Sequence, residues 1–488
     1  MKHQISTTVI NQPLGQPQSD DGIAMLFVQF KAIAGTDTTK AFNLNTAYLL
    51  TGMNDVASYG ITAALDITNG TALYQQLSEF YSEAGEGALL WLVGVNMTAN
   101  NNEFATANTP LPAYIGSTTC TNLIKYTGNK DFTQRAKLIG FCYALPTASQ
   151  VAADFPADVS ASLTAMQTLR ATLFNQGYQI NFIVDGYNMS ATVTPATLGN
   201  VGEDSYPNGS LCITGSQPNG ISGVGAALGR FAKISIGHGF NNVQDGSISL
   251  TSAYLTNGNL IQLRPTSVAD APIIEGVKYI VNVGTITYNS IDYSVGETFI
   301  GIADITTFTT SHSGTVNAVA TPVGGLYPGD INVSVAALVY PDDFDLLGEK
   351  QYMFLRTWEG HSGFYWNDGA TCSDPTTPES TQEFGRVANS LSASVRAFII
   401  DNVGQNVIID TKTGNVDQNY CNTLQQKFYD EYIVPLKVVG GTGDITDGSL
   451  KLSGTPNGNQ IQWNFILTIV ASPLVGGATG TVVFSYTL

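Results

Sequence analysis

Residues 361–372, HSGFYWNDGATC, bring together residue types that serve two kinds of chemistry. A cysteine in contact with a histidine can act as an activated nucleophile, and both side chains can bind a metal ion. The same stretch contains three aromatic residues and an Asn-Asp-Gly sequence, which are typical of strands and of a tight turn. It is therefore a candidate active site and equally a candidate structural hairpin.

The local motif favours the structural interpretation. The sequence GHSG at 360–363 resembles the start of a nucleophile elbow, G-x-S-x-G, but Phe364 stands where that motif requires glycine. A thiol nucleophile also needs its base in contact in space, and the separation of His361 and Cys372 along the chain does not establish such a contact.

We predict that this stretch forms a hairpin. Phe364 and Trp366 are expected to face one side of the strand and Tyr365 the other, because side chains alternate along a strand. An Asp-Gly pair between β-prone runs is a strong hairpin signal, so residues 367–369 are predicted to form the turn.

A glycine-rich stretch and a lone histidine have simpler explanations than ligand binding. GVGAALGR at 223–230 lacks the Lys-Ser/Thr pair of a phosphate-binding loop and the spacing of a dinucleotide fingerprint. Small residues at the start of a helix allow close helix packing, which is the role we predict for them. His238 is an isolated imidazole, expected to be a local hydrogen-bond partner.

Acidic residues could bind a cation in two places. These residues are Asp342, Asp343 and Asp345, and further along Asp401 and Asp410. Neither place has the glycine and terminal glutamate of a calcium loop, so a solvated acidic loop is predicted. We therefore expect no catalytic, cofactor-binding or metal-binding residue, no cofactor, and no enzymatic activity.

Composition excludes several partners. The chain of 488 residues has a net charge of −18, which repels phosphate backbones, so no nucleic-acid partner is expected. The first residues lack the apolar core of a signal peptide, and the most apolar run, 88–95, is too short to span a membrane, so no membrane insertion is expected. Five widely spaced cysteines without C-x-x-C spacing indicate reduced thiols and folding in a cytoplasm.

Hydrophobic periodicity predicts a mixed α/β core. Apolar runs predict strands at 23–30, 88–95, 136–145 and 178–187. Helical spacing predicts a helix over 73–84 that ends at Gly85, and another from an Asp158 cap to Gly177. Two further helices are predicted around 384–398 and 416–428, followed by a strand at 460–470 with its odd-numbered apolar residues on one face.

The predicted organisation has five parts. They are an N-terminal arm, 1–21; a first α/β part, 22–257; an inserted all-β domain, 258–330; a second α/β part, 331–472; and a C-terminal arm strand, 473–488. The insertion is rich in Val, Ile, Thr and Tyr and shows no helical period.

Both arms alternate apolar and polar residues, which suits pairing with a strand of another subunit. The alternating pattern continues to residue 488 and would leave an open edge unless another strand pairs with it. The predicted inter-subunit contacts are Ile5, Thr7, Val9, Val482, Phe484, Tyr486 and Leu488. Repeating one such contact gives an open helical assembly.

Three stretches carry a resemblance to a known family. They are 42–61 with the helix and strand that follow up to 95, 352–372 with the helix at 382–399, and the two helices and strands of the C-terminal part. In these stretches the chain resembles the contractile tail sheath proteins of bacteriophages and related injection systems, although the insertion departs from the minimal sheath plan.

The resemblance implies a mechanical function. A sheath subunit polymerises helically around the tail tube and contracts to drive the tube through the host envelope. The implied partners are other copies of the chain, the tube, baseplate and tail terminator proteins, and the implied location is a virion tail assembled in the bacterial cytoplasm. Another tail component, such as a tube or baseplate protein, and a β-rich adhesin or hydrolase remain alternatives.

The inserted segment yields a first prediction. Turn-rich sequences flank it at 256–259 and 324–330, so we expect 258–328 to be dispensable for the core. Replacing it with a short Gly-Ser joint should give a soluble protein that still assembles, measured by thermal melting and electron microscopy. Insoluble product from several joint lengths would place the segment in the core.

Overall fold

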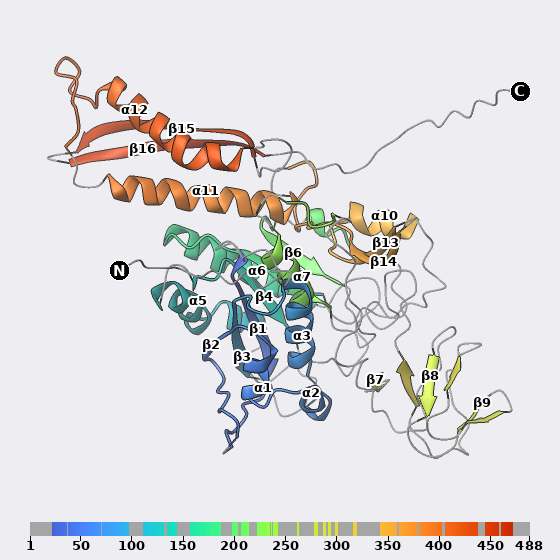
Figure 1. Ribbon diagram of the computed structural model, residues 1–488. Helices are drawn as coiled ribbons and strands as arrows, with labels where there is room; N and C mark the ends of the chain where they lie inside the picture. The colour runs from blue at the N-terminus through green and yellow to red at the C-terminus, as the bar shows by residue number, and fades with distance from the viewer. Residues whose placement is uncertain are drawn as a thin grey trace, which may run out of the picture. The chain divides into compact units, whose positions relative to one another are not determined.

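The computed structural model describes residues 22–36, 38–69, 71–96, 111–130, 134–143, 157–186, 198–203, 206–213, 222–234, 236, 238–242, the strands between 261 and 319, and residues 342–358, 361–377, 380–402, 406–437, 445–457 and 460–471. The chain divides into two compact units, 1–236 with 240–386 and 237–239 with 387–488 (Figure 1). Each unit is described by itself below.

The first unit is built on a six-stranded mixed sheet with the order β2-β3-β1-β4-β5-β6. Its strands are β1 (Ala24–Phe30), β2 (Ala47–Leu50), β3 (Leu90–Asn96), β4 (Leu138–Cys142), β5 (Asn181–Asp185) and β6 (Gly209–Cys212). All neighbours are parallel except the edge strand β2. The four strands predicted from apolar runs are confirmed, because strands covered on both faces are continuously apolar.

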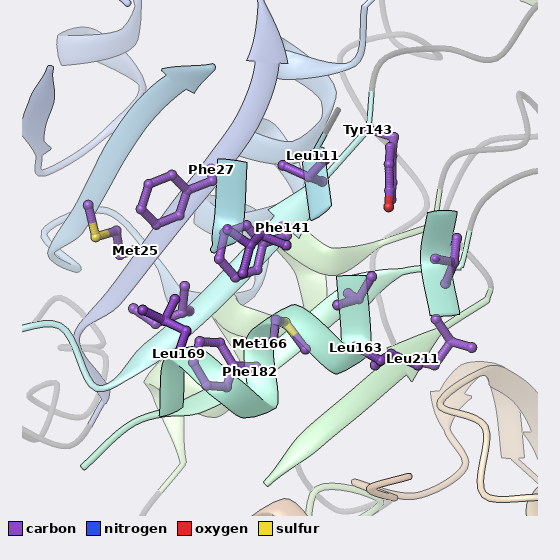
Figure 2. Packing of buried hydrophobic residues seen from close by; sticks show 14 of the residues in the cluster. Met25, Phe27, Leu111, Phe141, Tyr143, Leu163, Met166, Leu169, Phe182 and Leu211 are labelled. Atoms are coloured by element: carbon purple, nitrogen blue, oxygen red, sulfur yellow. The ribbon is translucent and has the colours of Figure 1, made fainter. Parts of the chain in front are cut away.

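One face of this sheet is built around stacked aromatic rings. Phe27, Phe141 and Phe182 come from β1, β4 and β5, and their neighbouring ring centroids are 5.0 Å and 6.2 Å apart. Leu163 and Met166 of α6 (Ala157–Asn175) pack over these rings (Figure 2). Burying one such phenylalanine stabilises the fold by about 1.5–3 kcal/mol, so this stack is a major part of the core.

The opposite face is covered by α3 (Leu73–Ala84) and α7 (Val224–Lys233), which lie side by side in Figure 1. Two glycines of α7 allow the close approach. A Cβ atom on Gly225 would lie 2.0 Å from the Gln76 carbonyl oxygen of α3, and one on Gly229 would lie 2.5 Å from the Phe80 carbonyl oxygen. The predicted packing role of the small residues at 223–230 is therefore confirmed.

Local signals fix the ends of several helices. The buried Asp66 carboxylate accepts hydrogen bonds from the Leu73 and Gln75 amides at the start of α3, at 3.0 and 3.2 Å. Gly85 ends α3 with a φ of 86°, as predicted. The predicted cap at Asp158 is wrong, because α6 begins at Ala157 and includes Asp158 in its first turn.

The remaining helices of the first unit are α1 (Met53–Ser58), α2 (Ala63–Asn69), α4 (Leu111–Ile115), α5 (Thr118–Lys130) and α10 (Asp342–Glu349). In the described part of the chain, no helix has both the length and the apolar character needed to cross a membrane.

The first turn of α11 (Gln382–Asp401) is inserted against the sheet of the first unit. The buried Gln382 carboxamide donates hydrogen bonds to the Phe182 carbonyl at 3.0 Å and to the Ser210 hydroxyl at 2.7 Å. Asn181 returns a bond to the Gln382 carbonyl at 3.2 Å, and Asn208 donates to the Asn181 side chain at 3.2 Å. These polar groups satisfy one another inside the core, which fixes the beginning of the helix.

The second unit contains most of α11, helix α12 (Gln418–Phe428) with a π-helical extension at 429–433, and a hairpin of β15 (Ile445–Asn457) and β16 (Gln460–Ala471). Asp417 caps α12 by accepting from the amides of Asn419 and Tyr420 at 2.9 and 3.1 Å. The two predicted helices and the predicted strand at 460–470 are confirmed.

The strands between 261 and 319 are short and antiparallel, in agreement with the predicted β character. β7 (Ile261–Gln262), β8 (Lys278–Val281), β11 (Thr298–Ile300) and β12 (Val316–Val319) form one sheet, and β9 (Ile286–Tyr288) pairs with β10 (Ile291–Tyr293). The division into compact units groups this segment with the first unit. That it folds as a separate domain stays a prediction.

The helix contact on the second face of the sheet can be tested with one methyl group. Gly225→Ala should destabilise the fold by roughly 2 kcal/mol, because the added Cβ meets a main-chain oxygen that cannot move aside, although alanine is the better helix former. Gly116→Ala is the matched control, since its Cβ would find its nearest neighbours 3.8 Å away. Urea unfolding measures both variants, and equal stabilities would contradict the packing argument.

Candidate functional site

The HSGFYWNDGATC stretch lies in a hairpin, but with a different partner from the one predicted. β14 (His361–Trp366) pairs with the preceding strand β13 (Leu355–Trp358). The turn predicted at 367–369 is wrong, because the Asn367 amide donates to the Phe354 carbonyl at 2.9 Å and continues the pairing with the preceding segment. The turn of the hairpin therefore lies between 358 and 361.

Cys372 is part of the core. Its side chain is fully buried, its amide donates to the Gly209 carbonyl at 2.8 Å, and its carbonyl accepts from the Tyr206 amide at 2.7 Å. All five cysteines are buried, and burial raises the pKa of the Cys120, Cys142 and Cys421 thiols. A buried neutral thiol is a poor nucleophile, so the geometry supports a structural role for Cys372.

The start of α7 does not offer a phosphate site. The Gly225 amide donates to the Gln76 side-chain oxygen at 2.5 Å, and the Gln76 side-chain nitrogen donates to the Ser222 carbonyl at 2.7 Å. The first turn of this helix is thus occupied by α3. His238 lies in a bend of the segment 238–242.

The acidic residues lie in different surroundings from the solvated loop predicted. Asp342, Asp343 and Asp345 belong to the first half of α10, where carboxylates interact favourably with the helix dipole, and Asp345 accepts from Arg356 at 3.3 Å. Asp410 accepts from the Lys412 amide at 2.9 Å, and this bond lowers its pKa. Asp401 is the last residue of α11.

Within the residues that the structure describes, no group of three or more His, Cys, Asp or Glu side chains is arranged to hold a metal ion.

A buried carboxyl group that sequence reasoning missed lies at the carboxyl end of β5. Asp185 is fully buried and accepts from the Ser222 hydroxyl at 2.7 Å, the Ser222 amide at 3.2 Å and the Tyr143 amide at 3.4 Å. Burial raises its pKa to about 7 even though these bonds favour the charged form. Asp185 thereby joins the ends of β4 and β5 to the start of α7. The signal in the sequence was an acid ending the apolar run NFIVD.

The β15–β16 hairpin has one covered and one open side. Leu450 and Leu452 of β15 are buried on the side of α12, whereas on β16 Phe465 is 50% exposed, Ile466 is 63% exposed and Val470 is 50% exposed. In the part of the chain described here, the long edge of β16 pairs with no third strand. The predicted strand is confirmed, but its apolar face is only partly covered.

The direction of the amides on this open edge follows from one hydrogen bond. The Leu452 amide donates to the Gln425 side chain of α12 at 2.7 Å, so it points away from β16. Leu452 is paired with Phe465, and in an antiparallel ladder both members of such a non-hydrogen-bonded pair direct their polar groups outward. The amide and carbonyl of Phe465 therefore point to the open edge.

Exposed apolar side chains concentrate in the second unit. Among the described residues, seven of the nine exposed large apolar side chains belong to it, although it is much the smaller unit. They are Ile400, Ile408, Ile409, Val434, Phe465, Ile466 and Val470. A concentration of this kind is typical of a surface that binds another protein.

The residues predicted to form inter-subunit strands lie outside the described residues. They are Ile5, Thr7 and Val9 in the first arm, and Val482, Phe484, Tyr486 and Leu488 in the second. Their pairing stays a prediction.

Comparisons with known proteins identify a family and several similar structures. A family model described as "DUF2586, N-terminal domain" matches residues 3–271. No curated protein sequence matches the chain.

The similar solved structures are assemblies or components of contractile machines. One is the anti-feeding prophage baseplate, with a TM-score of 0.45 and 10% identity, covering 100% of this chain and 99% of that chain. A second is the sheath complex of an extracellular contractile injection system, PVC, in the contracted state, with a TM-score of 0.42 and 11% identity, covering 100% and 98%. A third is the sheath tail protein from Desulfitobacterium hafniense, with a TM-score of 0.37 and 9% identity, covering 96% and 100%.

The buried Asp185 predicts a pH-dependent stability. Its pKa in the folded protein, about 7, is above the ordinary value of 3.8, so the folded state holds a proton that the unfolded state releases as the pH rises between these values. Wild-type stability should therefore fall over this range, whereas Asp185→Asn lacks this contribution. Between pH 4 and 8 the difference in unfolding free energy should shift in favour of the variant by on the order of 3 kcal/mol. Parallel pH profiles of the two proteins in thermal melts would contradict this.

Proposed function

This chain belongs to the DUF2586 family, and we propose that it is a tail sheath subunit that polymerises helically around a tail tube and contracts to drive the tube through a host envelope. The observation that carries the proposal is the open edge of β16, with outward-facing main-chain groups beside exposed apolar side chains. Such an edge is suited to accept a strand from another copy of the chain.

The sequence supports the same proposal independently of that edge. The stretches that resemble sheath proteins correspond to β2 through β3, to β13, β14 and α11, and to α12 with the β15–β16 hairpin. They therefore include both the core of the first unit and the part of the second unit that carries the open edge.

The arms supply candidate strands for that edge. The alternating segment 482–488 follows a Gly-rich stretch, SPLVGGATG at 472–480, that can serve as a tether, and the first arm has its own alternating segment at 5–9. We propose that an arm of one copy pairs with β16 of a neighbour. Because the donor and acceptor surfaces differ, the contact repeats without closing and produces a helical lattice.

This function requires no chemistry at a catalytic site. Contraction takes its free energy from the difference between an extended lattice and a more compact lattice that buries more surface. The proposed partners are the tube, baseplate and tail terminator proteins, and the proposed location is a virion tail assembled in the bacterial cytoplasm.

A proline substitution distinguishes strand pairing from a side-chain contact. Phe465→Pro removes an outward amide without breaking the ladder to β15, so it should abolish tubular assemblies in electron microscopy while lowering stability by only about 1–2 kcal/mol. Phe465→Ser removes the ring alone and should retain part of the assembly.

Two controls accompany this experiment. Phe174→Ser changes a similarly exposed ring, 44% against 50%, in the first unit and should assemble normally. Ile466→Pro removes the neighbouring amide, which faces β15, and should destabilise the hairpin by about 3 kcal/mol or more. Tubes of normal length from Phe465→Pro would refute strand pairing at this edge, and rings from the wild-type chain would favour a baseplate role.

A further inference from the structure

Two acidic side chains lie close together where the segment after β14 meets the first turn of α11. Glu383 is 1% exposed, and one of its oxygens accepts from the Phe240 amide at 2.7 Å. Its other oxygen, Oε2, is buried and forms no hydrogen bond with any residue that the structure describes. This oxygen lies against Gly369, where a Cβ atom would be 2.6 Å from it, and Gly369 directly follows Asp368.

The Asp368 carboxylate is turned back toward the same glycine. Its Oδ1 accepts from the Gly369 amide at 2.7 Å. The Gln382 amide donates to the Gly369 carbonyl at 2.7 Å, so the main chain on both sides of the two acids is joined by a hydrogen bond. The two carboxyl groups therefore sit at the joint between residues 366–370 and the helix.

The other groups around Glu383 do not neutralise the pair fully. Arg386 lies one turn further along α11, and its guanidinium contacts the ring of Phe231 at 5.4 Å and donates to the Ile234 carbonyl at 3.4 Å. Arg230 of α7 donates to the Phe240 carbonyl at 3.4 Å, so it holds the main chain that supplies the amide to Glu383.

We propose that Glu383 and Asp368 share one proton and form a pH-sensitive latch between residues 366–370 and the first turn of α11. With the proton on Glu383 Oε2, the group can donate toward the Asp368 carboxylate, and one buried negative charge remains. Loss of the proton leaves two buried negative charges that repel each other, which weakens the adjacent bond from Gln382 to Gly369. The latch operates within a single chain and does not depend on the proposed assembly.

The direction of the pH effect follows from the protonation states. Burial, and next the charge of Asp368, raise the pKa of Glu383 to about 7 from its ordinary 4.5, while Arg386 opposes this shift. Burial also raises the pKa of Asp368. The stabilisation from the closed latch is therefore complete below the ordinary value and is lost as the pH rises through about 7.

Hydrogen exchange at the joint tests the latch directly. In the full-length wild-type chain, protection of the Gln382 amide, corrected for the intrinsic pH dependence of exchange, should fall about tenfold for each pH unit above 7. Glu383→Gln keeps a donor at the same place and cannot ionise, so its protection should not vary with pH. Asp374→Asn removes a solvent-exposed carboxylate from the same part of the chain and should retain the wild-type profile.

A second variant covers the case in which Glu383→Gln does not fold. Asp368→Asn removes the repelling charge, so the fall in protection should move to lower pH. The latch is refuted if Glu383→Gln exchanges with the wild-type pH profile, if Asp368→Asn leaves the midpoint unchanged, or if wild-type protection is constant across pH 6–8.

Discussion

The carboxamide of Gln382 is the interaction on which the rest of the structure depends. It is buried at the edge of a parallel sheet and satisfies the Phe182 carbonyl of β5 and the Ser210 hydroxyl of β6. The sheet strands are short and the groups they expose at this place must be hydrogen-bonded, because an unpaired buried polar group costs about 1–3 kcal/mol. A residue nearly two hundred positions later in the chain supplies those bonds, and the same helix then continues to Asp401 in the second unit.

The elements of the fold were largely predictable from local patterns. The apolar runs of β1, β3, β4 and β5 and the periodic stripes of α3, α6, α11 and α12 are properties of contiguous sequence, and all were predicted. The errors concern choices between neighbours. The turn at 367–369 has good turn chemistry, but Asn367 bonds instead to Phe354, and nothing in a local pattern reveals that the preceding strand competes successfully.

The polar groups inside the core were not predictable in the same way. Asp185, Gln382 and Glu383 look like ordinary polar residues in the sequence, and their burial depends on partners far along the chain, such as Ser222 for Asp185 and Phe240 for Glu383. The chemistry-bearing cluster at 361–372 misled in the opposite direction, since its cysteine is fully buried. Residue type identifies candidate groups, but only long-range packing decides which of them are removed from water.

The open edge of β16 has a consequence for the behaviour of the protein in solution. An edge with unpaired main-chain groups and exposed apolar neighbours binds incorrect strands as readily as correct ones. The net charge of −18 opposes such encounters, because every copy repels every other copy at long range. At about 0.1 M salt that repulsion extends only about 10 Å, so ionic strength sets how often two edges meet. The low-salt chain is thereby kept apart from its own copies, and raising the salt concentration favours association at this edge.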